Sequence, residues 1–514
     1  MNLDTNWVPM KWPCGPLEIA RRNRSGTINA DVKEMIEAWG QPSALDLLKG
    51  TPINCLVVDW AYGGPEDSAQ QQALKPLLEA GRRLGLSFVG KVAMKEGTGA
   101  AVVAARAAGL SAVMLEDTSG QSSDLPAILQ FQRDKVAWDT ASTIFSSKEN
   151  IWPGLNLETM RGDTAIGGPT GVPWVDSNGW FSLLAGELAP GKILWLDFDP
   201  PDTSTVLHPA SYALAIADSR AYGSRWIISL DDKLRAALPK GNLQAKSVWD
   251  KVCEAAAFFE SHRDWETFKS QGVLAVISDF RGENASSSGE VLNLLNRRQV
   301  QFLIFERTAW HGHPARAHGQ DGRATTKDVL PPTQGLKAML WLDKEAPSAE
   351  QHSQLLAFVR QGGLVIAATY LGPQEVKPTK KDPSIHYKMY NVGKGQMAVA
   401  EEGFQDPYQV AVDTHLLVSR RNDLVRLYNP AATNCHSSID PGHRKRLIQV
   451  LNYSSDPADS VTLWVNARVE SAKLWQPGTK DARTLQGVAA APGTDFGLPP
   501  LSVYCALEFE DSNL

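Results

Sequence analysis

The stretch K-I-L-W-L-D-F-D-P-P-D, residues Lys192 to Asp202, decides the predicted fold. Its apolar run, residues 193–196, has the length of a buried strand, and Asp197, Asp199 and two prolines follow it directly. In an α/β barrel, the chemistry is carried by side chains at the carboxyl ends of the parallel strands. The stretch therefore predicts a barrel strand that delivers acids to the barrel mouth.

Residues 1–265 repeat this form, because short apolar runs alternate with helical patterns. Eight such runs in about 250 residues are typical of a (β/α)8 TIM barrel. An open doubly wound sheet is the alternative, and it is disfavoured because no G-x-G-x-x-G follows the first strand. Helices are expected between the strands, including two near residues 125–133 and 142–148. The strands are expected at residues 8–11, 53–60, 87–93, 112–115, 135–138, 152–157, 193–196 and 225–230.

The second half of the chain has two further patterns. Four apolar runs with helices between them predict a flavodoxin-like α/β domain over residues 266–400. From about residue 387 the pattern turns to short β-type runs between Gly, Pro and Asp turns, which predict a C-terminal antiparallel β-sandwich over residues 401–514. The barrel, residues 1–265, is expected to be the catalytic domain.

Composition and charge exclude several classes of protein. A net charge of −6 over 514 residues gives no reason to expect nucleic acid or an anionic membrane as a partner. No apolar run approaches the length of a membrane span. The five cysteines are scattered without a C-x-x-C, so neither a disulfide framework nor a zinc site is expected. The N-terminus lacks a signal-peptide pattern, which predicts a soluble, cytoplasmic protein, or a periplasmic or secreted one if a signal peptide has been removed.

The order of the three patterns resembles the clan of three-domain β-galactosidases, which have a (β/α)8 barrel, an amidotransferase-like domain and a C-terminal β-sandwich. The resemblance is carried by V-L-A-V-I-S-D-F (273–280), L-L-A-F-V-R-Q-G-G-L-V-I-A-A-T (355–369), L-I-Q-V-L-N-Y (447–453) and L-P-P-L-S-V-Y (498–504). The run at residues 168–180, G-P-T-G-V-P-W-V-D-S-N-G-W, is similar to one in uncharacterised bacterial glycosidase-like proteins. The resemblance implies a divergent glycoside hydrolase family, a structural middle domain and a homo-oligomer, dimer or trimer.

Glycoside hydrolysis needs two carboxyl groups, one protonated and one ionised. The resembled clan holds its acid after strand four, which here offers Glu116 or Asp117, and its nucleophile after strand seven, where Asp199 is preferred over Asp197. Any single strand-end acid is more often a helix cap or an Arg partner. So many acids at one barrel end nevertheless favour a function. The full set is Asp59, Glu116, Asp117, Asp139, Glu158, Asp197, Asp199 and Asp231.

Aromatic and polar residues beside these acids complete the predicted site. Trp12, Trp60 and Trp174 are candidates for stacking on a sugar ring; packing explains Trp60 and Trp174 equally well and is favoured for Trp12. Asp176 and Asn178 are candidates for binding sugar hydroxyls, or for starting a helix. The predicted substrate-binding set is Trp12, Asp59, Trp60, Asp139, Glu158, Trp174, Asp176, Asn178 and Asp197, in an acidic pocket.

The favoured function is that of a glycoside hydrolase that cleaves a carbohydrate substrate with a carboxylate pair, without metal or organic cofactor. A non-catalytic carbohydrate-binding or assembly protein on a barrel scaffold is the second hypothesis, because a fold does not fix a function. A hydrolase or lyase for acidic sugars is the third, and an acidic mouth fits it poorly.

Overall fold

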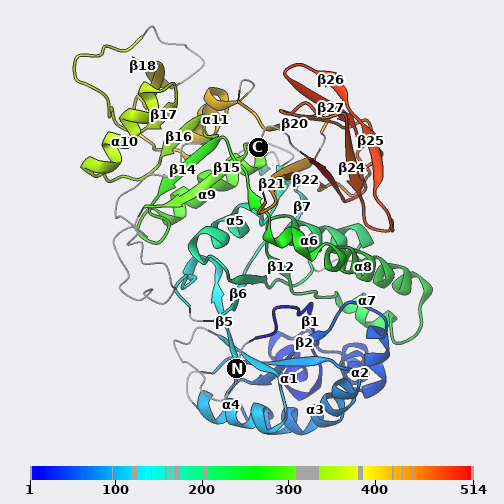
Figure 1. Cartoon of the computed structure of the whole chain (residues 1–514). Helices are drawn as coiled ribbons and strands as arrows, with labels where there is room; N and C mark the ends of the chain where they lie inside the picture. Colours follow the sequence, from blue (N-terminus) through cyan, green and yellow to red (C-terminus); the bar gives the residue numbers. More distant parts are fainter. Residues whose placement is uncertain are drawn as a thin grey trace.

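The computed structural model (Figure 1) describes residues 3–94, 97–116, 125–140, 142–156, 159–161, 164–166, 174–201, 207–307, 335–379, 386–419, 422–430, 432–442 and 444–510. The N-terminal unit, coloured blue to green, is built on a parallel sheet. A second sheet, green to yellow, and two antiparallel sheets, orange to red, make up the later units. No helix of the described residues is long and apolar enough to cross a membrane.

The first sheet is a closed parallel barrel, which confirms the predicted fold class. Its eight strands pair in the order β1-β2-β3-β4-β5-β6-β11-β12. A parallel bridge between Met10 and Ile228 closes the ring, and the Lys11 amide donates to the Ile228 carbonyl at 2.8 Å. The strands are β1 Pro9–Lys11, β2 Cys55–Ala61, β3 Ser87–Val92, β4 Ala112–Glu116, β5 Ala127–Gln132, β6 Ile144–Lys148, β11 Ile193–Leu196 and β12 Arg225–Trp226.

Helices surround the barrel and bury the outward face of its strands. Trp12, Ile36 and Leu77 belong to this layer, each less than 1% exposed. The helices are α1 Gly15–Ser25, α2 Ala30–Trp39, α3 Glu66–Arg83, α4 Thr98–Ala107, α5 Gly179–Leu188, α6 Pro209–Ala221, α7 Asp232–Ala237 and α8 Leu243–Ser261, with 3-10 helices η1 Pro42–Leu48, η2 Arg133–Lys135 and η3 Arg263–Thr267.

Strands five and six lie elsewhere than predicted. Residues 127–132 and 144–148, expected within helices, are β5 and β6. Along β5 the side chains alternate, since Ile128 faces the barrel interior while Phe131 belongs to the outer core. Residues 135–138 hold no strand, and β7 Gly154–Asn156 pairs outside the barrel with β10 Trp174–Asp176. A second short hairpin pairs β8 Thr159–Arg161 with β9 Thr164–Ile166.

The second unit has the strand order of a flavodoxin-like domain. Its sheet runs β15-β14-β16-β17-β19-β18, so the five parallel strands follow the order 2-1-3-4-5. The hairpin β18–β19 and helix α11 pack in its core through Tyr387, Ala398 and Val410, although α11 lies within the range predicted for the sandwich. The elements are β14 Leu274–Ser278, α9 Ala285–Arg297, β15 Phe302–Glu306, β16 Ala338–Trp341, α10 Ala349–Arg360, β17 Leu364–Ala367, β18 Tyr387–Val392, β19 Gly395–Ala400 and α11 Pro407–Val418.

The third unit is the predicted antiparallel sandwich. A six-stranded sheet, β13-β21-β22-β28-β24-β25, faces a four-stranded one, β20-β23-β27-β26, across a core that contains Ile448, Leu463 and Phe496. The strands are β13 Lys269–Ser270, β20 Val425–Tyr428, β21 Thr433–Ile439, β22 Lys445–Asn452, β23 Thr462–Val465, β24 Ser471–Trp475, β25 Arg483–Gln486, β26 Val488–Ala490, β27 Gly493–Gly497 and β28 Tyr504–Glu510.

Candidate active site

The barrel interior changes from apolar to polar along each strand. A packed layer that includes Val57, Met114, Ile128 and Trp195 fills its lower part. Because side chains alternate along a strand, the next inward position toward the mouth lies two residues after each residue of this layer. These positions form the mouth ring, which consists of Lys11, Asp59, Lys91, Glu116, Gln130, Gln132, Ser146, Lys148, Asp197, Asp199 and Ser229.

Lys11 at the end of β1 binds both acids of the opening stretch. Its Nζ lies 2.5 Å from Asp197 Oδ1 and 2.7 Å from Asp199 Oδ1. Burial of the ammonium acts to lower the pKa of Lys11, but the two carboxylates outweigh it and raise this pKa above its usual value. One cation thus neutralises part of the charge of two adjacent acids.

Asp197 and Asp199 differ in their exposure. The Asp197 side chain is 7% exposed, and its Oδ2 accepts a hydrogen bond from Gln130 Nε2 at 2.7 Å. The Asp199 side chain is 60% exposed, and Ser229 Oγ donates to its Oδ1 at 2.9 Å. Burial of Asp199 acts to raise its pKa, but Lys11 and Ser229 lower it to about 2. Asp199 is therefore ionised and accessible, whereas Asp197 lies deeper in the barrel.

Glu116 ends β4 and contacts the ammonium of Lys148, which ends β6. Gln130 and Gln132 of β5, the strand between them, face inward beside this pair, and Gln130 is fully buried. Both side chains of the ion pair remain about a fifth exposed, at 23% for Glu116 and 22% for Lys148. The predicted acid of strand four thus has a cationic partner at the mouth.

Asp59 ends the inward row of β2, and its Oδ1 accepts a hydrogen bond from the Tyr62 hydroxyl. The segment is held from behind by Gln70, fully buried on α3, whose Nε2 donates to the Asp59 carbonyl at 2.9 Å and to the Cys14 carbonyl at 3.1 Å. Gly15, at φ +80°, allows this contact, since a Cβ there would lie 2.5 Å from the Gln70 amide oxygen.

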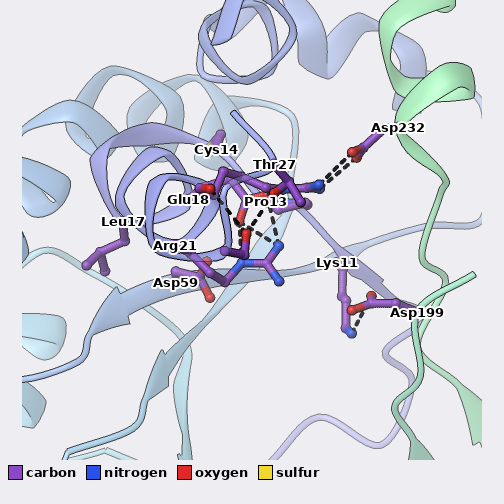
Figure 2. A network of polar contacts seen from close by, with 12 residues as sticks. Lys11, Pro13, Cys14, Leu17, Glu18, Arg21, Thr27, Asp59, Asp199 and Asp232 are labelled. Carbon is purple, nitrogen blue, oxygen red and sulfur yellow. Dashed lines mark hydrogen bonds and ion pairs between the residues drawn. The ribbon is translucent and has the colours of Figure 1, made fainter. Parts of the chain in front are cut away.

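Helix α1 extends a further charged group toward the mouth. Glu18, fully buried, accepts hydrogen bonds from Arg21 and Arg22, and Arg22 also pairs with Asp232. Figure 2 shows Arg21 reaching between Asp59 and the Lys11–Asp199 pair. Among the described residues, the mouth therefore holds the cations Arg21, Lys11, Lys91 and Lys148 as well as the predicted acids.

Trp12 and Trp60 do not line the mouth. Each is the outward neighbour of a ring residue, and their exposed fractions are 0% and 1%. Trp12 Nε1 donates to the Trp39 carbonyl at 2.8 Å, and Trp60 Nε1 donates to the Ala101 carbonyl at 3.0 Å. Both rings are therefore packed between the barrel and its helices and present no face to a sugar.

Asp176 and Asn178 also have structural partners. Asp176 pairs with Arg297 of α9 at 3.2 Å. Asn178 is fully buried, and its amide exchanges hydrogen bonds with the Ile151 backbone at 2.7 and 3.1 Å. The W-V-D-S-N-G-W segment therefore joins the barrel to neighbouring elements through these two residues.

Two further acids leave the predicted set. Residues 135–138, which were expected to form a strand that ends at Asp139, hold no strand, and Asp139 lies on the segment that leads into the start of β6. Asp139 pairs there with Arg281 at 3.0 Å. Asp231 accepts from the Lys233 and Leu234 amides at 2.9 and 3.0 Å, so it caps α7.

Three predicted site residues cannot be placed: Asp117, Glu158 and the Trp174 side chain lie outside the described residues. Conversely, seven members of the ring were not predicted: Lys11, Lys91, Gln130, Gln132, Ser146, Lys148 and Ser229. The first six stand at inward positions of strands and Ser229 follows β12, and which positions face inward depends on the strand register.

Comparison with known proteins extends to the whole chain at the level of fold. No protein-family model matches the sequence, and no curated protein matches it. Among solved structures, α-L-fucosidase isoenzyme 2 from Paenibacillus thiaminolyticus is similar over 99% of this chain and 100% of its own, with a TM-score of 0.57 and 11% identity. The exo-β-1,4-mannosidase Op5Man5 from Opitutaceae bacterium strain TAV5 matches 81% of this chain and 96% of its own, with a TM-score of 0.45 and 11% identity.

The likeness to the fucosidase confirms the predicted resemblance in fold to glycoside hydrolases built on a (β/α)8 barrel. At this identity the comparison concerns the fold alone.

Proposed function

We propose that this protein hydrolyses glycosidic bonds at the barrel mouth, with Asp199 as the ionised carboxylate of the reaction. The observation that carries the proposal is the setting of Asp199, which is held by Lys11 and Ser229 and is 60% exposed. A carboxylate that stays charged and reaches solvent at this end of a barrel is suited to attack an anomeric carbon or to deprotonate water. The fold shared with a fucosidase supports this reaction class.

A second carboxyl must protonate the leaving group. Two inward acids compete for this role, Glu116 of β4, which the sequence analysis favours, and Asp59 of β2. Asp197 is 7% exposed and bound by Gln130, so we assign it to holding Lys11 beside Asp199. We assign the binding of sugar hydroxyls to Gln132 and Lys91 of the ring and to Lys148, which pairs with Glu116.

Hydrolysis of a panel of 2,4-dinitrophenyl and phenyl glycosides by the full chain tests the proposal. We expect wild-type protein to turn over at least one sugar. Asp199→Asn should lower kcat/KM for that sugar by about 10³-fold or more, because a neutral amide cannot replace the charged carboxylate. Asp46→Asn, an exposed acid on η1, is the matched control and should leave kcat/KM unchanged. No turnover on the panel, or an Asp199→Asn variant as active as wild type, would contradict the proposal.

A carbohydrate-binding protein without turnover is the second candidate function. It is favoured by the ion pairs at the mouth, because Asp197, Asp199 and Glu116 each contact a lysine. Binding of the panel sugars by calorimetry, without release of the aryl group during long incubation, would select this function.

The homo-oligomer, dimer or trimer, and an amidotransferase-like origin of the second unit also remain proposals. Light scattering after size-exclusion chromatography tests the oligomer. A monomer at micromolar concentration would contradict it.

A further inference from the structure

We propose that Asp59, rather than Glu116, donates the proton to the leaving group, an inference that rests on the proposed glycoside hydrolysis. Asp59 belongs to the mouth ring and lies two residues above the interior core residue Val57. It shares with Asp199 the inward face of the barrel, and Arg21 lies between the two carboxyls (Figure 2).

Ion pairing separates Asp59 from the other acids of the ring. Lys11 contacts Asp197 and Asp199, and Lys148 contacts Glu116. Within the described part of the chain, Asp59 makes no ion pair. A proton donor must carry its proton when the reaction begins, and an ammonium in contact with a carboxyl favours the form without it. Among the acids of the ring, Asp59 is therefore the one whose ionised form is least stabilised by an ion pair.

The hydrogen bonds around Asp59 fix the carboxyl in one orientation. Tyr62 donates to Oδ1, and Oδ2 has no hydrogen-bond partner among the described residues. The Tyr62 turn is itself held, because the amides of Tyr62 and Gly63 donate to Asp67 at 2.9 and 2.8 Å. A carboxyl with one oxygen anchored and the other unoccupied is arranged to present a proton to a bound group.

The electrostatic setting agrees with this geometry. Burial raises the pKa of Asp59, and the hydrogen bond from Tyr62 and the charges of Lys91 and Arg21 oppose this rise without cancelling it. Asp199, in contrast, has a pKa of about 2. Carboxyl groups whose pKa values are moved apart are a common basis for dividing acid and base roles. The charged and titratable groups that face Asp59 are Lys91 from β3, Glu18 and Arg21 from α1, Cys14 before α1, and Tyr62.

In the proposed step the O–H bond of the Asp59 carboxyl breaks as its proton moves to the glycosidic oxygen. The electron pair of the broken C–O bond stays on that oxygen, which leaves as an alcohol. The anomeric carbon accepts an electron pair from Asp199 itself or from a water that gives its proton to Asp199. Overall one water is consumed, and Asp59 regains a proton before the next cycle.

Leaving-group dependence is the test, because a dinitrophenolate leaves without a proton and a phenolate needs one. We expect Asp59→Asn to lower kcat/KM for the phenyl glycoside by ~10²–10⁴-fold and to change it far less for the dinitrophenyl glycoside. The wild-type profile should fall on the alkaline side as Asp59 loses its proton, and this limb should vanish in Asp59→Asn. Tyr62→Phe should move the limb to higher pH, because the lost hydrogen bond favoured the ionised carboxyl.

Glu116→Gln is the competing variant, and it should keep the alkaline limb and the wild-type dependence on the leaving group. The inference is overturned if Glu116→Gln shows the selective loss instead, or if folded Asp59→Asn, checked by its melting temperature, hydrolyses both glycosides like wild type. Activity that requires Asp199 but not Asp59 would overturn this inference alone. The absence of any turnover would overturn the proposed function.

Discussion

Lys11 sets the charge state of the site at the scale of single residues. Its ammonium contacts Asp197 and Asp199, and this contact is the main reason why the pKa of Asp199 is about 2. Because Asp199 must be ionised to act, the activity should persist far into the acid range. The same pairing keeps two neighbouring carboxylates, which repel each other, within one ring.

Lys11→Met should therefore shift the acidic limb of kcat/KM upward. Without the ammonium, the pKa of Asp199 rises from about 2 toward or above the ordinary aspartate value of about 4, and activity is lost at a correspondingly higher pH. Rates between pH 3 and 7 measure the shift. Lys240→Met removes an exposed lysine near Glu34 and should leave the limb in place. An unchanged limb in Lys11→Met would contradict the assigned role of Lys11.

The acids of strands two, four and seven could be predicted from the sequence, and the cations between them were overlooked. An acid that ends an apolar run is visible because it breaks the run, as Asp197 does after I-L-W-L. Lys11 ends a strand of only three residues, and Lys148 ends a strand with only two apolar residues, so neither run marks its lysine. Position on the inward face, which depends on strand register, was the missing information.

At the scale of elements, β5 and β6 show that the periodicity of apolar residues does not always distinguish a strand from a helix. Residues 127–132 read A-I-L-Q-F-Q, and residues 144–148 read I-F-S-S-K. Polar residues replace apolar ones where these strands reach the mouth, so each strand retains only a short apolar part. Such short runs fit a helix or a strand almost equally well, and pairing with both neighbours decides the outcome. The remaining six strands kept longer runs or clear turn residues and were placed correctly.

The segment before α5 joins separate elements around one buried acid. Asp218 of α6 is fully buried, and it accepts from Ser177 Oγ at 2.6 Å and from the Tyr453 hydroxyl at 2.7 Å. Burial raises the pKa of Asp218, and these hydrogen bonds oppose the rise. Tyr453 follows β22, so the cluster links the sandwich to the barrel. The sequence motif that suggested sugar binding is explained by this structural role.

Tyr453→Phe should lower the free energy of unfolding by about 1–3 kcal/mol, because it leaves a buried carboxyl without one of its donors. The KM for a responsive glycoside should not change. Urea denaturation measures the first effect and steady-state kinetics the second. Tyr408→Phe, a partly buried tyrosine on α11, is the matched control and should cost less than about 0.5 kcal/mol. A stable Tyr453→Phe variant with a raised KM would contradict the structural role.

At the scale of the whole molecule, the hydrophobic cores cross the limits of the three units. Phe258 and Phe259 of α8 share one core with Leu451 and Tyr504 of the sandwich. Leu184 and Leu188 of α5 share another with the second sheet. Direct hydrogen bonds reinforce these contacts, such as Gln449 Nε2 to the Ala221 carbonyl at 2.9 Å. The barrel therefore depends on both later units to cover its helices.

The shared cores predict that the chain unfolds in one cooperative transition, although it contains three kinds of sheet. Phe259, 5% exposed, lies with its ring centroid 4.9 Å from that of Tyr504. Phe259→Ala should therefore cost about 3–5 kcal/mol and lower the Tm of the whole chain in one calorimetric peak. Leu243→Ala, on the same helix but 82% exposed, should change the free energy of unfolding by less than about 0.5 kcal/mol. A core common to the barrel and the sandwich cannot lose the Phe259 ring without destabilising both units. If the calorimetric scan of Phe259→Ala instead splits into separate peaks and only one peak moves to lower temperature, the two units unfold independently and the prediction is contradicted.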